Sequence, residues 1–596
     1  MSTSMLGLLL ILTMAAAAQP TTLYVAPDGS DDNPGTAAAP FATVAKARDA
    51  VRGLVRDGLD SDVVVLVRAG TYYLDEPLVF GPEDSGTGEH AVTYGAYPGE
   101  TPVISGGRAI TGWKEAGAGK WQVELPEVKA GAWRFRQLFA DGQRLPRGRC
   151  HNGDGLLRVK SVSGDVTEIV LDTSPSAADL AGMDAELVVY NNWSISRVRV
   201  VASDGPKLKT ANPVGWIGHG AATTASPNKP CRVENALEFV DEAGEWYLER
   251  RSGVLTYMAA EGEDPNDRQF VAPRLEHLVI AKGRPDAPVR HVRFRGLAFE
   301  HAEWPLPEFG YLGIQAGHHG THIKKPTYVL PLALGFVRAE DCALEDCRVA
   351  HIGATAVGFG AACRRNRVEG CHIEDVGGNG IMVGWRSDYG GVPVVGAGGH
   401  SRSPNLAADW DDPADAPSHN VVANCVLRDC AAVNHGCVAI YDAFCAGTRI
   451  AHNLVHDMPY TGISVGFRWD MSETTQRDAA IEYNHVHDVM KKLADGGCIY
   501  TLGWQPGTVL RGNLLHDVHR SGFAHGGAPN NGIFFDQGSK GYFVEGNIIY
   551  NTSGKPIRFN QTGEEHLTWQ DNHFGVAPDD PAFPTEAARK AGPEQQ

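Results

Sequence analysis

The sequence predicts an all-β protein: a right-handed parallel β-helix, a solenoid like that of the pectin lyases, with an inserted antiparallel β-sandwich domain. Three observations lead to this fold. The chain has 596 residues, 70 of them Gly and 35 Pro, with few long helical patterns, which is typical of a turn-dense β protein. One short unit repeats through the C-terminal half. Between residues 111 and 265 the repeat gives way to alternating apolar and polar residues joined by Gly, Asp and Asn turns, as in an antiparallel sandwich.

The repeat extends from about residue 266 to 575 and is the strongest structural signal. Each unit carries a small polar residue at one turn position, which is Cys347, Cys371, Cys425, Asn453, Asn484, Asn513 or Asn547. One coil per unit, with strands stacked about 4.8 Å apart, forms a parallel β-helix. We expect the Asn side chains to form a hydrogen-bonded ladder and the Cys side chains to be buried.

The segments outside the repeat complete the predicted organisation. Residues 1–18 are apolar and end in small residues, so we interpret them as a secretory signal peptide, with a short uncleaved anchor as the alternative. Residues 19–110 are expected to form an N-terminal cap and the first coils, with Thr43 capping a helix from about Val44 to Leu54. The inserted lobe spans 111–265, the β-helix with the active site spans 266–575, and 576–596 form a flexible tail.

Composition restricts the partners. The formal net charge of -18 argues against nucleic acid or an anionic membrane, because both require clustered Lys and Arg. Nothing after the signal is long and apolar enough to span a membrane. The 11 Cys form no CxxC pair, and His318, His319 and His322 have no acidic or Cys partner at ligand spacing. We therefore expect no disulfide framework, no metal and no cofactor. The apolar N-terminal segment predicts a secreted or periplasmic protein. The oligomeric state is not indicated.

Two carboxylates interrupt the repeat and are the candidate catalytic residues. Asp495 precedes the strand that begins at Gly497, and Asp536 follows the strand that contains Gly532. In successive coils they are adjacent, and paired carboxylates about 5 to 9.5 Å apart hydrolyse glycosidic bonds. If the two glycines are equivalent, Asp495 comes two residues before its glycine and Asp536 four after, so the turn at Asp495 must fold back over the strand. The competing interpretation is that each Asp caps backbone amides in a turn.

Other residues are candidates for substrate contact. Asp442 is taken to occupy the repeat position of Asp536 in an earlier coil, and His525 lies in a polar loop. Aromatic side chains next to acids suit sugar rings. The remaining candidates are Arg468, Trp469, Asp470 and Trp504. A second repeated position carries His456, His487 and His516, for which turn hydrogen bonds are favoured over a functional row.

The strings DGGCIYTLGWQPGT, GIFFDQGS, PYTGISVGFRW and EFGYLGIQAG resemble secreted bacterial β-helix glycosidases with an inserted β-sandwich lobe, above all glycoside hydrolase family 141. The resemblance covers nearly the whole chain after the signal. It implies that Asp495 and Asp536 are the catalytic pair and that the substrate is a plant or algal polysaccharide or its side chains. Family activities include α-L-fucosidase and xylanase, so the sugar does not transfer with the fold. This sequence departs from the family pattern at Phe534, Phe535 and Gln537, which bears on specificity.

We expect Asp536 to act as nucleophile or base and Asp495 as acid; the stereochemical outcome and the choice between chain ends and internal bonds stay open. One alternative is a polysaccharide lyase or uronate epimerase, for which Lys491, Lys492 and Arg558 are available. Another is a non-catalytic carbohydrate-binding solenoid.

Overall fold

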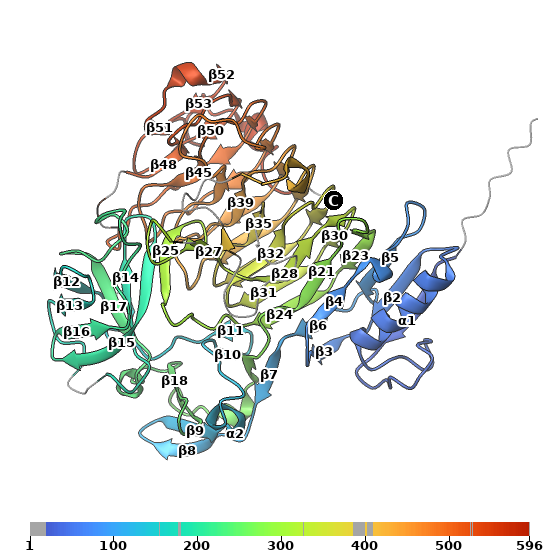
Figure 1. The fold of residues 1–596 in the computed structure, drawn as a ribbon, viewed down its shortest axis with the longest axis horizontal. Coiled ribbons are helices and arrows are strands. Elements are labelled where there is room, and N and C mark those ends of the chain that lie inside the picture. Colours follow the sequence, from blue (N-terminus) through green and yellow to red (C-terminus); the bar gives the residue numbers. More distant parts are fainter. Residues whose placement is uncertain are drawn as a thin grey trace, which may run out of the picture.

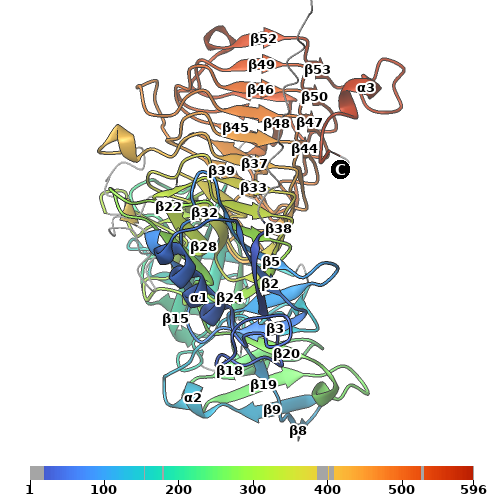
Figure 2. The same ribbon diagram turned by 90° about the vertical axis from the view of Figure 1, so that its right-hand side faces the viewer.

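The computed structural model describes residues 19–594 except 154, 177–179, 326, 385–399, 402–408, 525 and 527–528. The predicted signal peptide lies outside the described residues. Three long parallel sheets wind into one solenoid, which the chain follows from blue to red (Figure 1), and the strands stack in register when the view is turned (Figure 2). The predicted β-helix is confirmed.

The strands of the three long sheets follow in spatial order. The first sheet contains β1 (Thr21–Val25), β2 (Val63–Val67), β5 (Val92–Ala96), β23 (Val292–Arg295), β30 (Ala343–Glu345), β33 (Arg367–Glu369), β37 (Val421–Ala423), β40 (Arg449–Ala451), β43 (Ala480–Glu482), β46 (Val509–Arg511), β49 (Phe543–Glu545) and β52 (Thr568–Gln570). The second contains β3 (Gly70–Tyr73), β6 (Pro102–Ser105), β24 (Ala298–Ala302), β31 (Arg348–Ile352), β34 (His372–Val376), β38 (Val426–Cys430), β41 (Leu454–His456), β44 (His485–Val486), β47 (Leu514–Leu515), β50 (Ile548–Ile549) and β53 (His573–Phe574). The third contains β4 (Leu78–Phe80), β21 (Val279–Lys282), β28 (Leu332–Val337), β32 (Thr355–Phe359), β35 (Ile381–Val383), β39 (Ile440–Asp442), β42 (Ile463–Val465), β45 (Gly497–Thr501), β48 (Asn531–Phe535) and β51 (Ile557–Phe559). The short strands β22 (Val289–Arg290) and β29 (Ala339–Glu340) pair beside them.

The lobe is built from antiparallel sheets beside the solenoid (Figure 1). Its largest sheet contains β14 (Glu186–Tyr190), β17 (Pro230–Glu234), β12 (Leu157–Val162), β13 (Glu168–Leu171), β16 (Lys207–Thr210), β15 (Ile195–Asp204), β25 (Tyr311–Gln315), β26 (His318–His319), β27 (Thr327–Val329) and β36 (His400–Ser401). Two smaller sheets contain β18 (Trp246–Glu249), β19 (Val254–Met258), β9 (Lys120–Glu124) and β8 (Lys114–Gly117), and then β11 (Gln143–Arg144), β10 (Phe139–Ala140), β20 (Phe270–Pro273) and β7 (Gly107–Ile110). Strands β25 to β27 come from the insertion after β24, so the lobe also recruits chain that follows residue 265.

Helices are few and lie at the margins. Helix α1 (Val44–Asp57) packs Val44, Ala47 and Val51 into the solenoid core, and the Thr43 hydroxyl accepts a hydrogen bond from the Lys46 amide, as the sequence predicts. The other helices are α2 (Pro126–Lys129), α3 (Thr585–Ala588) and the 3-10 turns η1 (Pro82–Asp84), η2 (Leu237–Phe239), η3 (Pro265–Asp267), η4 (Pro413–Asp415) and η5 (Glu564–His566). After α3, the Gly592 amide donates to the carbonyl of Tyr483, which holds the C-terminal residues against the second sheet.

The predicted Asn ladder is confirmed. Each buried Asn accepts hydrogen bonds at Oδ1 from the amide and the Nδ2 of the Asn one coil earlier, over distances of 2.9 to 3.1 Å, from Asn453 through Asn484, Asn513 and Asn547 to Asn572. Cys425 continues the column, because its amide donates to Asn453. All 11 Cys are buried and free. Every buried turn amide in this column is therefore satisfied by the next coil.

The repeated His position makes turn hydrogen bonds, as the sequence favours. His456, His487 and His516 each donate from Nδ1 to the Asp that follows in the chain. Their rings also stack, with centroids 5.3 Å and 5.0 Å apart, and Tyr550 ends the column. The row therefore stabilises the turns of the second sheet.

Candidate functional site

A cleft of about 430 Å³ lies between the third long sheet and the lobe. The β-helix contributes Tyr460, Arg468, Trp469, Asp470, Asp495, Tyr500, Asp536, Gln537 and Asn560. The lobe and the insertion contribute Trp193, Trp216, His219, Ile314, Gln315 and Ile323. Five residues singled out from the sequence therefore meet here, including both candidate catalytic acids.

The two acids meet although they do not share a strand position. Ile499 of β45 lies beside Ile533 of β48, so Gly497 lies beside Asn531 and the assumed equivalence of Gly497 with Gly532 is wrong by one residue. Asp495 has a left-handed backbone, with φ of 65°, two residues before β45 begins. This turn brings Asp495 into the cleft, as the sequence argument required. The charge of Asp495 acts on Asp536.

Asp536 directly follows β48 and is half-buried in the cleft wall. Burial raises the pKa of its carboxyl group above the ordinary value, and the charge of Asp495 acts in the same direction. Hydrogen bonds oppose this shift, because the Tyr500 hydroxyl donates to Oδ2 and Asn560 Nδ2 donates to Oδ1 over 2.7 Å. Burial also raises the pKa of Tyr500 well above its ordinary value, so the phenol keeps its proton to donate.

Asp495 has a different environment. Its Oδ1 forms an ion pair with Arg558 Nη1 of β51, at 2.5 Å. The Arg558 guanidinium in turn lies 3.9 Å from the centre of the Phe534 ring. Tyr460 donates from its hydroxyl to the Asp495 carbonyl, at 3.2 Å, which fixes the turn. Arg558, proposed from sequence as a lyase group, is therefore the partner of one acid.

The predicted contacts after β42 lie in the cleft wall. Arg468 forms a two-pronged ion pair with Asp470, with Nε to Oδ1 at 2.9 Å and Nη2 to Oδ2 at 2.8 Å. The hydrogen bond from Arg468 lowers the pKa of Asp470, and Ser472 adds to it. Trp469 packs edge-on against Phe467, with centroids 4.7 Å apart. Trp469 lies between the two ion-paired residues in the chain, and its indole lines the same cleft as Asp495 and Asp536.

The opposite wall is aromatic and was not predicted. Trp193 lies in the turn between β14 and β15, and its Nε1 donates to the Ile314 carbonyl at 2.7 Å. Trp216 stacks on His219, with centroids 5.1 Å apart and planes at 22°. The sequence shows no periodic signal for these residues, because they reach the acids only through the fold of the insertion. Aromatic faces opposite paired acids suit a sugar ring.

Two other predicted contacts lie outside the cleft. Asp442 is fully buried and pairs in register with Val465, which pairs with Thr501 and then Phe535, so its assignment to the position of Asp536 is wrong by one residue. Because side chains alternate along a strand, this shift turns its carboxylate into the solenoid. Trp504 lies under the Lys540 ammonium, 5.2 Å from its ring centre, rather than in the cleft wall. His525 lies outside the described residues.

The described residues contain no group of three or more His, Cys, Asp or Glu placed to hold a metal ion. His318 instead stacks on Phe467, with centroids 4.1 Å apart. In the same part of the chain, no helix has the length and apolarity needed to cross a membrane. Of the lysines considered for lyase chemistry, Lys491 pairs with Asp457 at 2.5 Å and Lys492 lies 5.3 Å from the Phe523 ring centre.

Comparison with known proteins places the fold. Residues 119–260 match the GH141 insertion domain, that of glycoside hydrolase family 141. A solved structure described as a glycoside hydrolase is 26% identical, with a TM-score of 0.84, over 96% of this chain and 99% of that chain. XylC in complex with xylose is 13% identical with a TM-score of 0.47, over 90% and 70% of the two chains. A rhamnogalacturonan lyase is 12% identical with a TM-score of 0.38, over 96% and 95%. No curated protein matches. The insertion-domain match and the 26%-identical structure support glycoside hydrolase activity.

Proposed function

For this parallel β-helix protein, which is like those of glycoside hydrolase family 141, we propose that it is a secreted glycosidase acting on a plant or algal polysaccharide or its side chains, with Asp495 and Asp536 as the catalytic pair. One observation carries the proposal: two carboxylates from successive coils line one cleft, facing an aromatic wall. Glycoside hydrolysis requires one carboxyl group to protonate the leaving oxygen and a second to act as nucleophile or base.

The surroundings of the acids suggest their roles. Asp536 has a pKa raised by burial, which suits the group that must carry a proton to the glycosidic oxygen. Asp495 forms an ion pair with Arg558, which suits the group that must act as an anion. We therefore assign Asp536 as general acid and Asp495 as nucleophile or base. This order reverses the sequence expectation, because the sequence did not show that Arg558 forms an ion pair with Asp495.

The charge of the cleft favours a neutral sugar, such as a fucosyl or xylosyl residue. Three carboxylates line it, those of Asp470, Asp495 and Asp536, and the one lining arginine, Arg468, is already paired with Asp470. A lyase or epimerase needs a cation to neutralise the uronate at the reacting carbon. Among the described lining residues no such unpaired cation is present.

Sugar release by the wild type, Asp495→Asn and Asp536→Asn tests the proposal on a panel of fucosylated and xylosylated glycans. Each variant is expected to lose at least about 10²-fold in kcat/KM. Asp442→Asn is the matched control, because it changes a buried Asp of the same sheet outside the cleft, and it is expected to keep wild-type activity. Release that persists in both cleft variants would refute the site, and an ultraviolet-absorbing unsaturated product would show a lyase instead.

Aryl glycosides of the released sugar separate the two roles. With a good leaving group such as dinitrophenol, protonation is dispensable, so Asp536→Asn is expected to regain much of its activity whereas Asp495→Asn is not. Recovery in Asp495→Asn alone would reverse the assignment.

A further inference from the structure

A second cavity, of about 250 Å³, is lined mainly by residues of the lobe and shares no lining residue with the cleft. Five arginines line it, which are Arg134, Arg136, Arg147, Arg199 and Arg250. In a chain with a formal net charge of -18, this is a local concentration of positive charge. Neither the glycosidase proposal nor the Asn ladder uses these residues.

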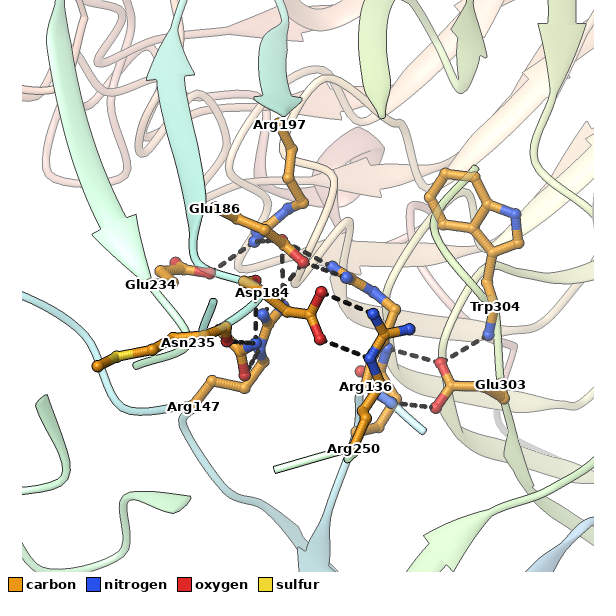
Figure 3. Close-up of polar contacts among 12 residues, drawn as sticks. Arg136, Arg147, Asp184, Glu186, Arg197, Glu234, Asn235, Arg250, Glu303 and Trp304 are labelled. Carbon is orange, nitrogen blue, oxygen red and sulfur yellow. Dashed lines mark hydrogen bonds and ion pairs between the residues drawn. The ribbon is translucent and has the colours of Figure 1, made fainter. Parts of the chain in front are cut away.

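Buried acids do not cancel this charge. Glu186 is 4% exposed and accepts hydrogen bonds from Arg136, Arg147 and Arg197. Burial alone would raise the pKa of Glu186. The neighbouring guanidinium groups outweigh burial and hold this pKa well below its ordinary value, so Glu186 is an anion. Arg197 also binds Glu234 at 2.5 Å. Figure 3 shows the resulting network, in which three guanidinium groups share two carboxylates.

The other acids in the wall are paired, buried or at the rim. Asp184 forms a two-pronged ion pair with Arg250, at 2.5 and 2.6 Å. Glu303 is buried, and burial raises its pKa, while the amides of Arg136 and Trp304 donate to its two oxygens. Glu308 is exposed at the rim.

Two arginines are left to meet a ligand. Arg134 and Arg199 are both exposed, and within the described part of the chain neither side chain has an ion-pair partner. Arg199 lies directly opposite Glu186 in the register of β14 and β15, so it is anchored on regular strands. A guanidinium on a rigid strand is preorganised for a planar carboxylate.

The remaining wall is apolar. Phe135 and Leu248 are buried at its base, and the run Pro305–Leu306–Pro307 forms one side. An apolar side opposite guanidinium groups matches a ring that has carbon-bound hydrogens on one face and a carboxylate at its edge.

We propose that this cavity binds the carboxylate of an acidic sugar, a uronate residue of a polysaccharide. The hairpin of β14 and β15 connects it with the cleft, since its turn carries Trp193 and its other end carries Glu186 and Arg199. Trp193 follows Glu186 by seven residues, most of them in β14, which corresponds to roughly 20 Å of extended chain. A polymer along the hairpin reaches both sites, so the lobe holds an acidic backbone while the cleft takes a neutral sugar. Binding at the cavity does not depend on the glycosidase proposal.

Calorimetric titration of trigalacturonate into Asp495→Asn tests this inference without turnover. Arg134→Gln and Arg199→Gln are each expected to weaken binding about tenfold, and the binding should weaken further with added NaCl. Glu308→Gln is expected to strengthen it about twofold by removing a nearby like charge. Arg251→Gln, on the same lobe with a side chain 80% exposed, is the matched control and should leave binding unchanged.

Three results would overturn the inference. The first is no measurable trigalacturonate binding at millimolar concentration. The second is binding that is unaffected by both arginine variants but lost in Trp469→Ala, which would place the anion in the cleft. The third is an affinity for inorganic sulfate equal to that for trigalacturonate, which would show a simple anion site without sugar recognition. Maltotriose is expected not to bind at the cavity.

Discussion

At Asp536, burial and hydrogen bonding act in opposite directions on one carboxyl group. Burial raises its pKa, whereas the Tyr500 hydroxyl and the Asn560 amide stabilise the anion. Burial outweighs the two hydrogen bonds, so the pKa of Asp536 is raised and the carboxyl group keeps its proton to higher pH. The same hydrogen bonds fix the position of the carboxyl group. The two donors therefore set the upper end of the pH range in which an acid at this position works.

Removing one donor should shift that range. In Tyr500→Phe the anion of Asp536 loses a hydrogen bond worth about 1.5 kcal/mol or more, so the pKa should rise by about one unit. Because Asp536 is assigned as the acid, the alkaline limb of kcat/KM should move to higher pH by the same amount. Tyr542→Phe is the control, since Tyr542 donates to the Leu502 carbonyl inside the core. An alkaline limb that stays in place or moves down contradicts the assignment.

The carboxylate of Asp442 is buried with too few hydrogen bonds to offset its loss of hydration. Gln476 donates to its Oδ2 at 2.8 Å, but its buried Oδ1 has no hydrogen-bond partner in the described residues, and burial raises its pKa. A raised pKa in the folded state means that the folded chain binds more protons, so this group's contribution to stability falls as pH rises from the unfolded value through the folded one.

Asp442→Asn should remove this loss of folding stability at higher pH, because the amide does not ionise. The variant is expected to have a higher melting temperature than the wild type at pH 7 to 8, with the difference shrinking toward pH 4. Thermal melts at several pH values measure it. A variant less stable than the wild type at neutral pH would show that the carboxylate is better satisfied than the contacts indicate.

Among the elements, the Asn ladder is the feature most directly tied to sequence. The side chain of Asn513 makes four hydrogen bonds in a fully buried position, to Asn484, Asn547 and the carbonyl of Ile481. Asn513→Ala should lower the free energy of unfolding by at least about 3 kcal/mol, because it leaves a buried amide without a partner. Asn572→Ala, at the half-buried end of the same ladder, should cost about 1 kcal/mol. Denaturant unfolding of the two variants compares them, and equal losses would show that burial does not control the cost.

The strand register explains which site residues were predictable. A turn Asn that recurs once per coil gives the coil count directly, and Asp495 and Asp536 stand out as interruptions of that pattern. The glycines mark the register poorly. Ile499 pairs with Ile533, so Gly497 pairs with Asn531 and not with Gly532. The resulting error of one residue put Asp442 on the wrong face. The aromatic wall had no pattern at all, since Trp193 and Trp216 precede the acids by about 300 residues.

For the whole molecule, the lobe is not uniformly separate from the solenoid. Val188, Tyr190 and Ile195 of the β14–β15 hairpin belong to the same buried cluster as the solenoid interior. The sheet of β8, β9, β18 and β19 packs around a separate small cluster, and β8 is exposed throughout. Buried contacts therefore join one half of the lobe to the β-helix more tightly than the other.

Hydrogen exchange should reveal this division. Peptides covering β14 and the start of β15 are expected to exchange as slowly as those covering β42, and peptides covering β8 and β9 at least tenfold faster. Tyr190→Ala should speed exchange in both the hairpin and the neighbouring coils. Uniform exchange across the lobe would show that it opens as one unit.

The position of the acids along the chain affects when the protein can first act. Asp495, Asp536 and the residues that hold them, Arg558 and Asn560, all lie in or next to the last three strands of the third sheet. A chain emerging from the ribosome can stack its early coils and fold most of the lobe before these residues have been made. The cleft is then an incomplete surface until synthesis passes Asn560. With Asp495 and Asp536 as the proposed catalytic pair, a chain that ends before Asn560 is expected to be inactive.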